Sequence, residues 1–356
     1  MSTSVTRAVT ETPFEGFLNN CDEQTWSATI AALVPSIHEV DKGATQIWFA
    51  FFPLGLLRAL EEADDAEKLA KELLLQGNYY LKDQIDSSHK FLYGHRYWPQ
   101  VKQAVERRAD EWHRLQSVSL DQSETEVCAT ALRDQILEVA REVGAALKVD
   151  PSLLVGITAA AFMTVLQVGL AAFKAAPDNI QIDQKHAKKS PAQILKERAR
   201  DDSQGLLGFL KTVDKKWTVV FDENDDAAKY KLNNFQDLAW GAADDRSRDW
   251  LAIDPRRVEG PIPVECRSAS CGTCWVGVLG GAEKLAAVGT RESKKIKEFG
   301  YIDTDQSKPL IRLACQAQAE GAVSIVIPPW NGVFGKYLKA KKQPTAEKET
   351  EQETVN

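Results

Sequence analysis

Apolar residues recur with two different periods along the chain. Through roughly the first two hundred residues they lie three or four positions apart, which places them on one face of an α-helix. Proline after a capping residue, as in Asp150-Pro151 and Ser190-Pro191, marks helix starts. The pattern predicts six or more helices before Gly208 and hardly any sheet. One clear helical stripe consists of Leu132, Ile136, Val139 and Val143.

From Trp217 the period changes to two, which is typical of strands. Trp217, Val219 and Phe221 alternate along one predicted strand, and 230–232 is a second strand that completes a hairpin. We expect Asn233 or Asn234 to cap a following helix. The buried face of that helix is predicted to hold Phe235, Leu238, Ala239 and Ala242. A last alternating stretch, 323–327, ends at two prolines.

These patterns divide the chain into three parts. Residues 1–205 are predicted to form a helical domain whose role the sequence does not give. Residues 206–336 are predicted to form a second domain that mixes strands with helices. The tail, 337–356, is polar and charged, and it cannot bury enough apolar surface to become ordered.

The segment 153–173 is uncharged and about as long as a membrane span of roughly 20 residues. It also contains Gly156, Thr158, Gln167 and Gly169, and it is rich in alanine. This composition favours a buried helix at a domain core or an oligomer interface. The alternative is a membrane-associated relay that uses this segment.

Charge and the N-terminus restrict the partners and the compartment. The 356 residues carry a formal net charge of −7, and nucleic-acid binding needs clustered Lys and Arg, so we expect no nucleic acid as the main partner. Residues 1–13 lack an apolar core of signal-peptide length. We therefore expect a cytoplasmic protein whose cysteines stay reduced, a state in which spaced cysteines more often bind metal than form disulfides.

Four of the six cysteines have the spacing of an iron–sulfur site. Cys266, Cys271 and Cys274 lie in one short loop, and Cys315 follows after forty residues. Two irons and two sulfides need four thiolates, three of which one tight loop can provide. The loop is built from small residues, which let backbone N–H groups turn toward the sulfurs. A structural zinc site is the alternative, but zinc usually takes two Cys-x-x-Cys pairs.

The same residues carry a family resemblance. The segment Cys266 to Cys274 resembles the cluster loop of plant-type [2Fe–2S] ferredoxins, and 313–316 resembles the fourth-ligand segment of that family. The resemblance covers roughly 217–329. It implies a β-grasp fold for this part, so the expected fold class is α+β, an all-α domain followed by a β-grasp ferredoxin-like domain. It also implies one [2Fe–2S] cluster, with Cys266 and Cys271 on the iron nearer the surface and Cys274 and Cys315 on the other.

The chain departs from this family at three places. Alanine stands at position 269 where the family often has glycine, and alanine tolerates a positive φ less well. An insertion, 244–263, precedes the loop. A second insertion between Cys274 and Cys315 is predicted to form a charged helix over 291–298. Either insertion could reshape a docking surface.

Other candidate residues have simpler explanations. His89 and His95 flank an aromatic segment that could be a docking or redox-relay site, but their spacing matches no metal motif, and we favour an aromatic loop packed between helices. The aromatic run 47–52 is expected in the core, as is Cys128. Lys294, Lys295 and Lys297 form a solvated helix face or a basic patch for an acidic partner.

The sequence therefore predicts one-electron transfer rather than substrate catalysis. We expect a non-catalytic carrier or dedicated relay subunit of a larger redox enzyme, of hydrogenase, dehydrogenase or oxygenase type. Electron donor and acceptor proteins are the expected partners, with the helical domain mediating an oligomer or a stable enzyme complex. The alternative is a redox-responsive binding or assembly protein, whose cluster switches the affinity for a partner.

Overall fold

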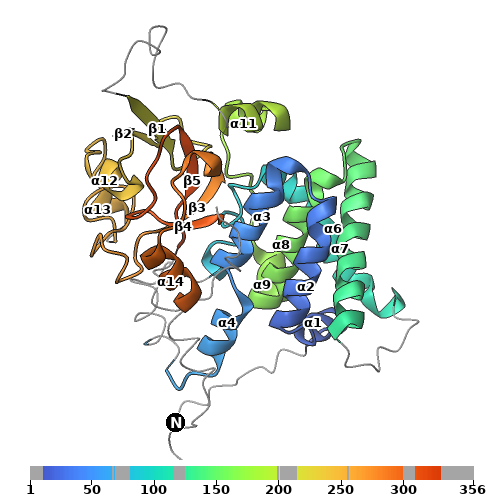
Figure 1. Ribbon diagram of the computed structural model, residues 1–356. Coiled ribbons are helices and arrows are strands. Elements are labelled where there is room, and N and C mark those ends of the chain that lie inside the picture. The colour runs from blue at the N-terminus through green and yellow to red at the C-terminus, as the bar shows by residue number, and fades with distance from the viewer. Residues whose placement is uncertain are drawn as a thin grey trace, which may run out of the picture. The chain divides into compact units, whose positions relative to one another are not determined.

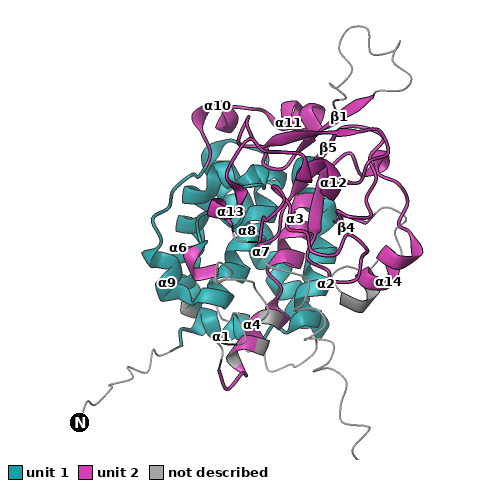
Figure 2. Cartoon of the chain, turned by 90° about the vertical axis from the view of Figure 1, so that its left-hand side faces the viewer, with its two compact units in different colours: residues 1–42, 84–181 teal, residues 43–83, 182–356 magenta. Residues whose placement is uncertain are grey.

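The computed structural model describes residues 11–65, 68, 81–115, 125–198, 200, 215–254, 256–299 and 309–329. The chain divides into two compact units (Figure 2). The first comprises 1–42 and 84–181, and the second comprises 43–83 and 182–356. The expected boundary at 205/206 and the polar tail 337–356 both lie outside the described residues, so they stay predictions.

The described part of the first unit is helical, as the 3.6-residue period predicts. Two short 3-10 helices, η1 and η3, accompany its α-helices, and α3 (Glu39–Phe51) begins in this unit and continues into the second. The other helices are α1 (Pro13–Asn19), α2 (Glu23–Leu33), η1 (Val34–Ser36), η3 (Tyr93–Tyr97), α6 (Trp98–Leu115), α7 (Thr125–Leu147), α8 (Ser152–Val168) and α9 (Leu170–Ala175).

The apolar segment 153–173 forms the centre of this unit. Every residue of α8 from Leu153 to Val165 is buried, and the helix packs against α6 and α7 (Figure 1). Gly169, with φ of 82°, ends α8 and α9 follows directly. No helix within the described ranges has both the length and the apolar character needed to cross a bilayer. The prediction of a buried helix is confirmed.

The second unit contains all of the strands found in the described residues. Before the sheet it includes α3 from Gly43 onward and several short helices. These helices are α4 (Leu54–Glu61), η2 (Leu81–Asp83), α10 (Gln184–Ala187) and α11 (Pro191–Arg198). The predicted cap of α11 is present, because the Ser190 hydroxyl accepts the Gln193 N–H while the Gln193 side chain accepts the Ser190 N–H.

Five strands form one mixed sheet in the order β2-β1-β5-β3-β4 (Figure 1). The pair β1–β5 is parallel and the other neighbouring pairs are antiparallel. The predicted hairpin is therefore confirmed, and the last predicted strand lies at the centre of the sheet. The strands are β1 (Lys216–Val220), β2 (Lys229–Asn233), β3 (Trp275–Gly280), β4 (Ile311–Leu313) and β5 (Val323–Val326).

The helix after the hairpin differs from its prediction at its start. Helix α12 (Leu238–Ala243) is capped by Asp237, whose carboxylate accepts the Trp240 N–H, so the cap is neither Asn233 nor Asn234. Phe235 precedes the helix with φ of 63° and is 56% exposed, so it does not belong to the buried face. The buried residues of α12 pack on β2, where a Cβ on Gly241 would lie 2.5 Å from the Leu232 Cβ.

Both predicted insertions contain a helix. The first holds α13 (Trp250–Ile253), capped by Asp249, and the second holds η5 (Ala282–Lys284) and α14 (Thr290–Phe299). Glu292 and Ile296 share the inner face of α14 and are both buried, whereas Arg291 and Lys294 are exposed. The helix is thus amphipathic, with one acidic residue on its buried side.

The aromatic run in α3 is core, as predicted, and it contributes to the second unit. Trp48, Phe51 and Phe52 are each at most 2% exposed. Ile47 touches the sheet at β3, where a Cβ on Gly277 would lie only 2.6 Å from the Ile47 Cγ2. Glycine at position 277 is therefore what allows this helix to approach the strand so closely.

Candidate functional site: the cysteine loop

The sheet register brings the fourth cysteine to the other three. The cysteine loop leads directly into β3, and Cys315 comes two residues after β4. Trp275 pairs with Leu313 in the antiparallel ladder, and the Ala314 N–H donates to the Cys274 carbonyl at 2.8 Å. Cys274 and Cys315 are thus held opposite each other by backbone pairing, although 41 positions separate them in the numbering.

The loop itself reverses direction through a series of left-handed residues. Arg267, Ala269 and Gly272 have φ of 51°, 61° and 73°. An L-residue at positive φ costs free energy, because its Cβ crowds the following carbonyl. Alanine was expected to tolerate a positive φ at position 269 less well than glycine does. Ala269 nevertheless adopts the left-handed conformation. The loop therefore keeps its shape at the expense of strain at two non-glycine residues.

Backbone N–H groups converge on the Cys266 sulfur. The N–H groups of Ser270 and Cys271 donate to its Sγ at 3.3 and 3.2 Å. The Cys271 Sγ lies 3.1 Å from the Thr273 hydroxyl, and the Gln316 amide donates to the Cys315 Sγ at 3.4 Å. Such donors stabilise negative charge on sulfur, whether on a thiolate or on a cluster.

The four thiols form two hydrogen-bonded pairs. Cys266 pairs with Cys271, and Cys274 pairs with Cys315. Electrostatic interactions also link Cys271 to Cys274 and Cys266 to Cys315, so the two pairs lie near each other. The second pair is buried, with Cys274 2% and Cys315 7% exposed, while Cys266 and Cys271 are only partly buried.

Each pair contains one thiol that ionises readily. Burial raises the pKa of the Cys266 thiol, but hydrogen bonds from Ser270, Cys271 and the loop backbone outweigh it and lower the pKa to about 5. The hydrogen bond from Cys274 lowers the pKa of the Cys315 thiol to about 7. Burial raises the pKa of the Cys271 thiol. The hydrogen bond to Cys315, together with burial, raises the pKa of the Cys274 thiol. Metal ligation requires thiolates, so a bound metal centre would displace the remaining protons.

The donor set suits a binuclear iron centre. Four thiols in two neighbouring pairs, with N–H groups directed at the sulfurs, correspond to the ligand demand of two irons. Across the described ranges, no group of three or more His, Cys, Asp or Glu side chains is arranged to hold a single metal ion.

The remaining sequence candidates do not join this site. The Cys21 thiol is buried and donates to the Phe17 carbonyl. Cys128 lies on α7 but is only partly buried, so the expectation of a core residue is wrong. His89 and His95 are buried and share a 2.9 Å hydrogen bond between their Nδ1 atoms. The Nε2 atom of His89 is hydrogen-bonded to the Ile85 carbonyl, and the Nε2 atom of His95 accepts the Gln181 N–H. The interpretation as a packed aromatic loop agrees with these contacts.

Sequence reasoning missed the ion pair that anchors the fourth-ligand segment. Arg312 and Glu292 are each 1% exposed and joined by two hydrogen bonds of 2.7 and 2.9 Å. Glu292 also accepts the Leu313 N–H at 2.9 Å, two residues before Cys315. The helical spacing of Glu292 and Ile296 could have indicated that this acidic residue faces inward.

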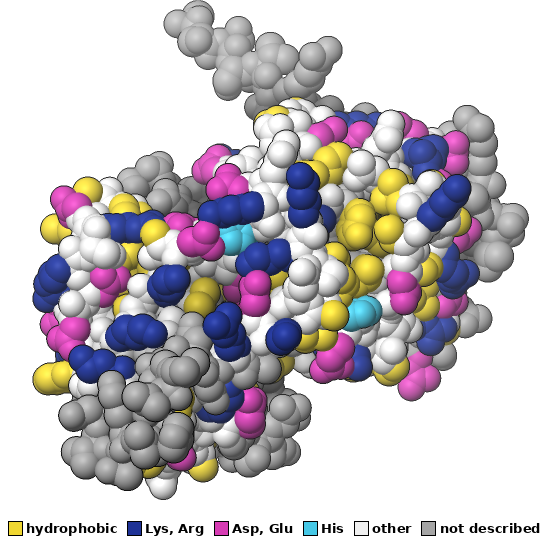
Figure 3. Space-filling model, turned by 90° about the horizontal axis from the view of Figure 1, so that it is seen from above, with side chains coloured by type: hydrophobic (Ala, Val, Ile, Leu, Met, Phe, Trp, Pro, Cys, Tyr) yellow, Lys and Arg dark blue, Asp and Glu magenta, His cyan; other side chains and the backbone are white. Residues whose placement is uncertain are grey.

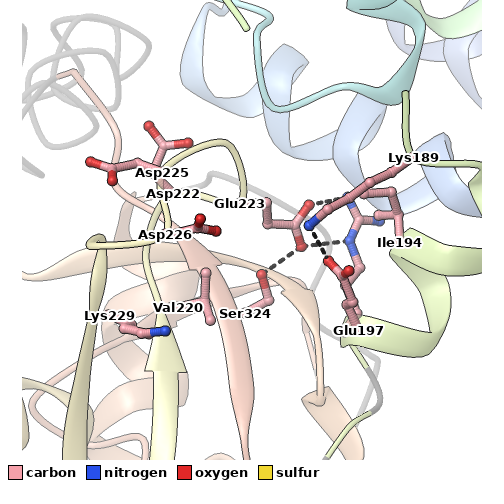
Figure 4. Close-up of a pocket in the computed structure, with 11 residues that line it drawn as sticks. Lys189, Ile194, Glu197, Val220, Asp222, Glu223, Asp225, Asp226, Lys229 and Ser324 are labelled. Atoms are coloured by element: carbon pink, nitrogen blue, oxygen red, sulfur yellow. Dashed lines mark hydrogen bonds and ion pairs between the residues drawn. The ribbon is translucent and has the colours of Figure 1, made fainter. Parts of the chain in front are cut away.

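A small cavity of about 120 Å³ lies elsewhere in the second unit, between α11 and the β1–β2 turn (Figure 4). Its walls are mostly charged, and most of these charges are paired. Arg198 binds the Glu223 carboxylate with two hydrogen bonds, and the Ser324 hydroxyl donates to the same group at 2.6 Å. These contacts bind α11 to the sheet, so this cavity is a packing feature.

Comparison with known proteins agrees with this geometry. Residues 249–320, which contain all four cysteines, match the family model of the 2Fe-2S iron-sulfur cluster binding domain. The chain therefore carries a plant-type ferredoxin domain in its C-terminal part, and its cofactor is a [2Fe–2S] cluster. A ferredoxin from Bacillus thermotolerans is 40% identical over 60 residues, which are 17% of this chain and 43% of that ferredoxin. No solved structure matches the chain.

Proposed function

We propose that Cys266, Cys271, Cys274 and Cys315 hold the [2Fe–2S] cluster. The observation that carries this assignment is their meeting as two neighbouring thiol pairs, one from the loop alone and one joined by the β3–β4 register. The exposure of the thiols supports the division that the resemblance implies. Cys266 and Cys271 would bind the iron nearer the surface, and the buried pair would bind the inner iron.

We further propose that the second unit is a β-grasp domain. Its mixed five-stranded sheet, with a hairpin at one edge and the last strand at the centre, supports this proposal. Helix α12 packs on β2. The insertions with α13 and α14, together with the part of α3 from Gly43 onward, would then be additions of this chain to that fold.

The function proposed is one-electron transfer by a carrier or a dedicated relay subunit of a larger redox enzyme. When bound, a [2Fe–2S] cluster accepts and releases one electron, at roughly −400 mV in plant-type proteins. The chain's own residues hold the charge that accompanies each electron. The N–H groups of Ser270 and Cys271 and the amide of Gln316 donate to ligand sulfurs, and the partly exposed Cys266 side gives a partner access.

The proposed partners are electron donor and acceptor proteins, with the helical unit as the site of a stable complex. On the face shown in Figure 3, basic and acidic side chains are interspersed. Such a surface offers no continuous basic track for a phosphate backbone. None of the six cysteines forms a disulfide, which suits the reducing environment of the cytoplasm that we propose as the compartment.

The test is spectroscopy of the anaerobically purified protein with iron and sulfide analysis. We expect two irons and two sulfides per chain, and a rhombic EPR signal that appears on reduction with dithionite. Cys315→Ala should lose the signal, while the matched control Cys128→Ala should keep it. A colourless protein that contains zinc, or a Cys315→Ala variant with an unchanged signal, would refute the assignment.

A further inference from the structure

Exposed apolar side chains are concentrated just before the cysteine loop. Among the described residues, six large apolar side chains are exposed, and five of them lie within 235–258. A soluble protein exposes single apolar residues at random, so such a concentration within one short stretch calls for an explanation. The five are Phe235, Trp240, Leu251, Ile253 and Val258, with exposed fractions of 56%, 53%, 54%, 51% and 69%.

One of these side chains lies against a residue of the cluster loop, and a second is adjacent in sequence to a partner of that residue. The Arg267 guanidinium lies 4.6 Å from the centre of the Trp240 ring. Arg267 also pairs with Glu259, the neighbour of Val258. Trp240 therefore lies against Arg267, which directly follows Cys266, and Val258 precedes the residue that Arg267 binds. A partner seated on these side chains would be close to the more exposed thiol pair.

Folding of the domain does not require Trp240 to be a tryptophan. The residues of α12 that pack on the sheet are on its other face, and Trp240 projects outward with half of its surface exposed. Large aromatic side chains are enriched in protein interfaces, where they dominate the binding energy. Trp240 thus presents a large, half-exposed aromatic ring beside the cluster loop, where the ring lies against the Arg267 guanidinium.

Charges in the same stretch are predominantly negative at the surface. The arginines are mostly engaged internally, since Arg248 binds Asp225, Arg256 binds Asp254 and Arg267 binds Glu259. Exposed acidic side chains remain at Asp244, Asp249 and Glu265. They outnumber the one exposed arginine of this stretch, Arg246, which donates to the Ala243 and Glu259 carbonyls. A partner that fits this stretch therefore has basic groups around its own apolar contact surface.

We propose that Trp240, Leu251, Ile253 and Val258 form the docking surface for an electron-transfer protein whose apolar contact surface is bordered by Lys or Arg. This inference rests on the proposed function. Four half-exposed side chains offer a few hundred Å² of apolar surface, which is below the roughly 800 Å² per partner of a stable complex. The contact is a short-lived encounter, as repeated electron delivery requires.

The probe for this surface is cytochrome c, a basic protein with an apolar haem edge. One electron passes from the dithionite-reduced holoprotein, freed of excess reductant, to the ferric haem, and stopped-flow absorbance gives the second-order rate constant. Ferricyanide is the comparison acceptor, because a small ion needs no docking surface. The variants are Trp240→Ser and Val258→Ser, and the matched control is Ile180→Ser, the exposed apolar residue of the first unit.

We expect Trp240→Ser to slow reduction of cytochrome c by about tenfold or more, and Val258→Ser to slow it less. Rates with ferricyanide should be unchanged, and Ile180→Ser should change neither rate. Equal cytochrome c rates for Trp240→Ser and wild type would overturn the proposal, as would equal slowing with both acceptors. A change in sedimentation of Trp240→Ser would also overturn it, by identifying the occupant as a second copy of the chain. A wild-type protein that dithionite cannot reduce would instead refute the proposed function itself.

Discussion

The buried pair of Arg312 and Glu292 gives the sharpest test of what holds the fourth cysteine in place. Both side chains are 1% exposed, and besides each other they bind the Ala286 carbonyl and the Leu313 N–H. Replacing Arg312 by Met leaves the Glu292 carboxylate buried without its counter-charge. Removing one partner of such a pair typically costs about 3–5 kcal/mol.

The cost should be visible in both folding and cluster retention. For a domain of this size, about 3–5 kcal/mol corresponds to a fall of roughly 6–20 °C in the transition temperature. The Leu313 N–H bond lies two residues before Cys315, so its loss loosens the fourth thiol. Arg312→Met should therefore also lose its visible absorbance faster in the presence of an iron chelator. Circular dichroism and absorbance melts of the same holoprotein samples measure the two effects.

Two further variants decide whether the charge pairing is the cause. The double variant Arg312→Met/Glu292→Met removes both charges and should recover part of the stability, because neither partner is then left alone. The exposed pair Lys185 and Asp226 is the control in the same unit, and Lys185→Met should leave the melt unchanged. A transition in Arg312→Met within 2 °C of wild type would refute the reasoning, since it would mean that the pair contributes no more than a surface pair (about 0–1 kcal/mol).

Three other predictions address the loop, the histidines and the sheet. Ala269→Gly should retain iron, whereas Ala269→Val should lose it, because a β-branched residue is strongly disfavoured at φ of 61°; iron analysis after purification would contradict this if both variants were loaded equally. Burial holds the pKa of His95 at about 3, below its unfolded value near 6.5, so stability is full above pH 6.5 and declines as the pH falls toward 3. His95 alone should contribute a loss of about 3 kcal/mol at pH 4 in urea unfolding of the first unit. The loss should be smaller by this amount in His95→Gln, where burial still keeps the pKa of His89 below its ordinary value; an equal loss in both proteins would mean that other groups cause it. Gly277→Ala should destabilise by about 1–3 kcal/mol through overlap with Ile47, and the added substitution Ile47→Ala should restore part of this in thermal melts; full additivity would show that the two residues do not touch.

The sequence allowed the cluster and the strands to be predicted because both depend on local patterns. Four thiols at fixed spacings reflect the demand of two irons, and alternation from Trp217 reflects one buried sheet face. The cap of α12 was mispredicted because Asn233, Asn234 and Asp237 are all capping residues, and the actual choice depends on Phe235 turning outward at positive φ.

The contacts that the sequence could not reveal are those between distant segments. Glu292 lies on a charged helix that looked solvated, and only its partner Arg312 on β4 explains its burial. Ile47 belongs to a helix that patterning assigned to the helical domain, yet it fills the space left by Gly277 in the second unit. Such pairings depend on the chain's path in three dimensions, and a single sequence does not record that path.

The contact between Ile47 and Gly277 also bears on how this protein is made and how it can be cut. The helix segment that contains Ile47 covers part of this sheet, and it leaves the ribosome well before the first strand. The strands therefore complete their packing on a segment that was made earlier, and not on one another alone. A fragment that starts at residue 216 would expose the bare glycine face of β3 to water. The ferredoxin part therefore cannot be transferred to another protein as residues 216–329 alone. A fusion protein also needs the helical segment from Gly43 to Phe51.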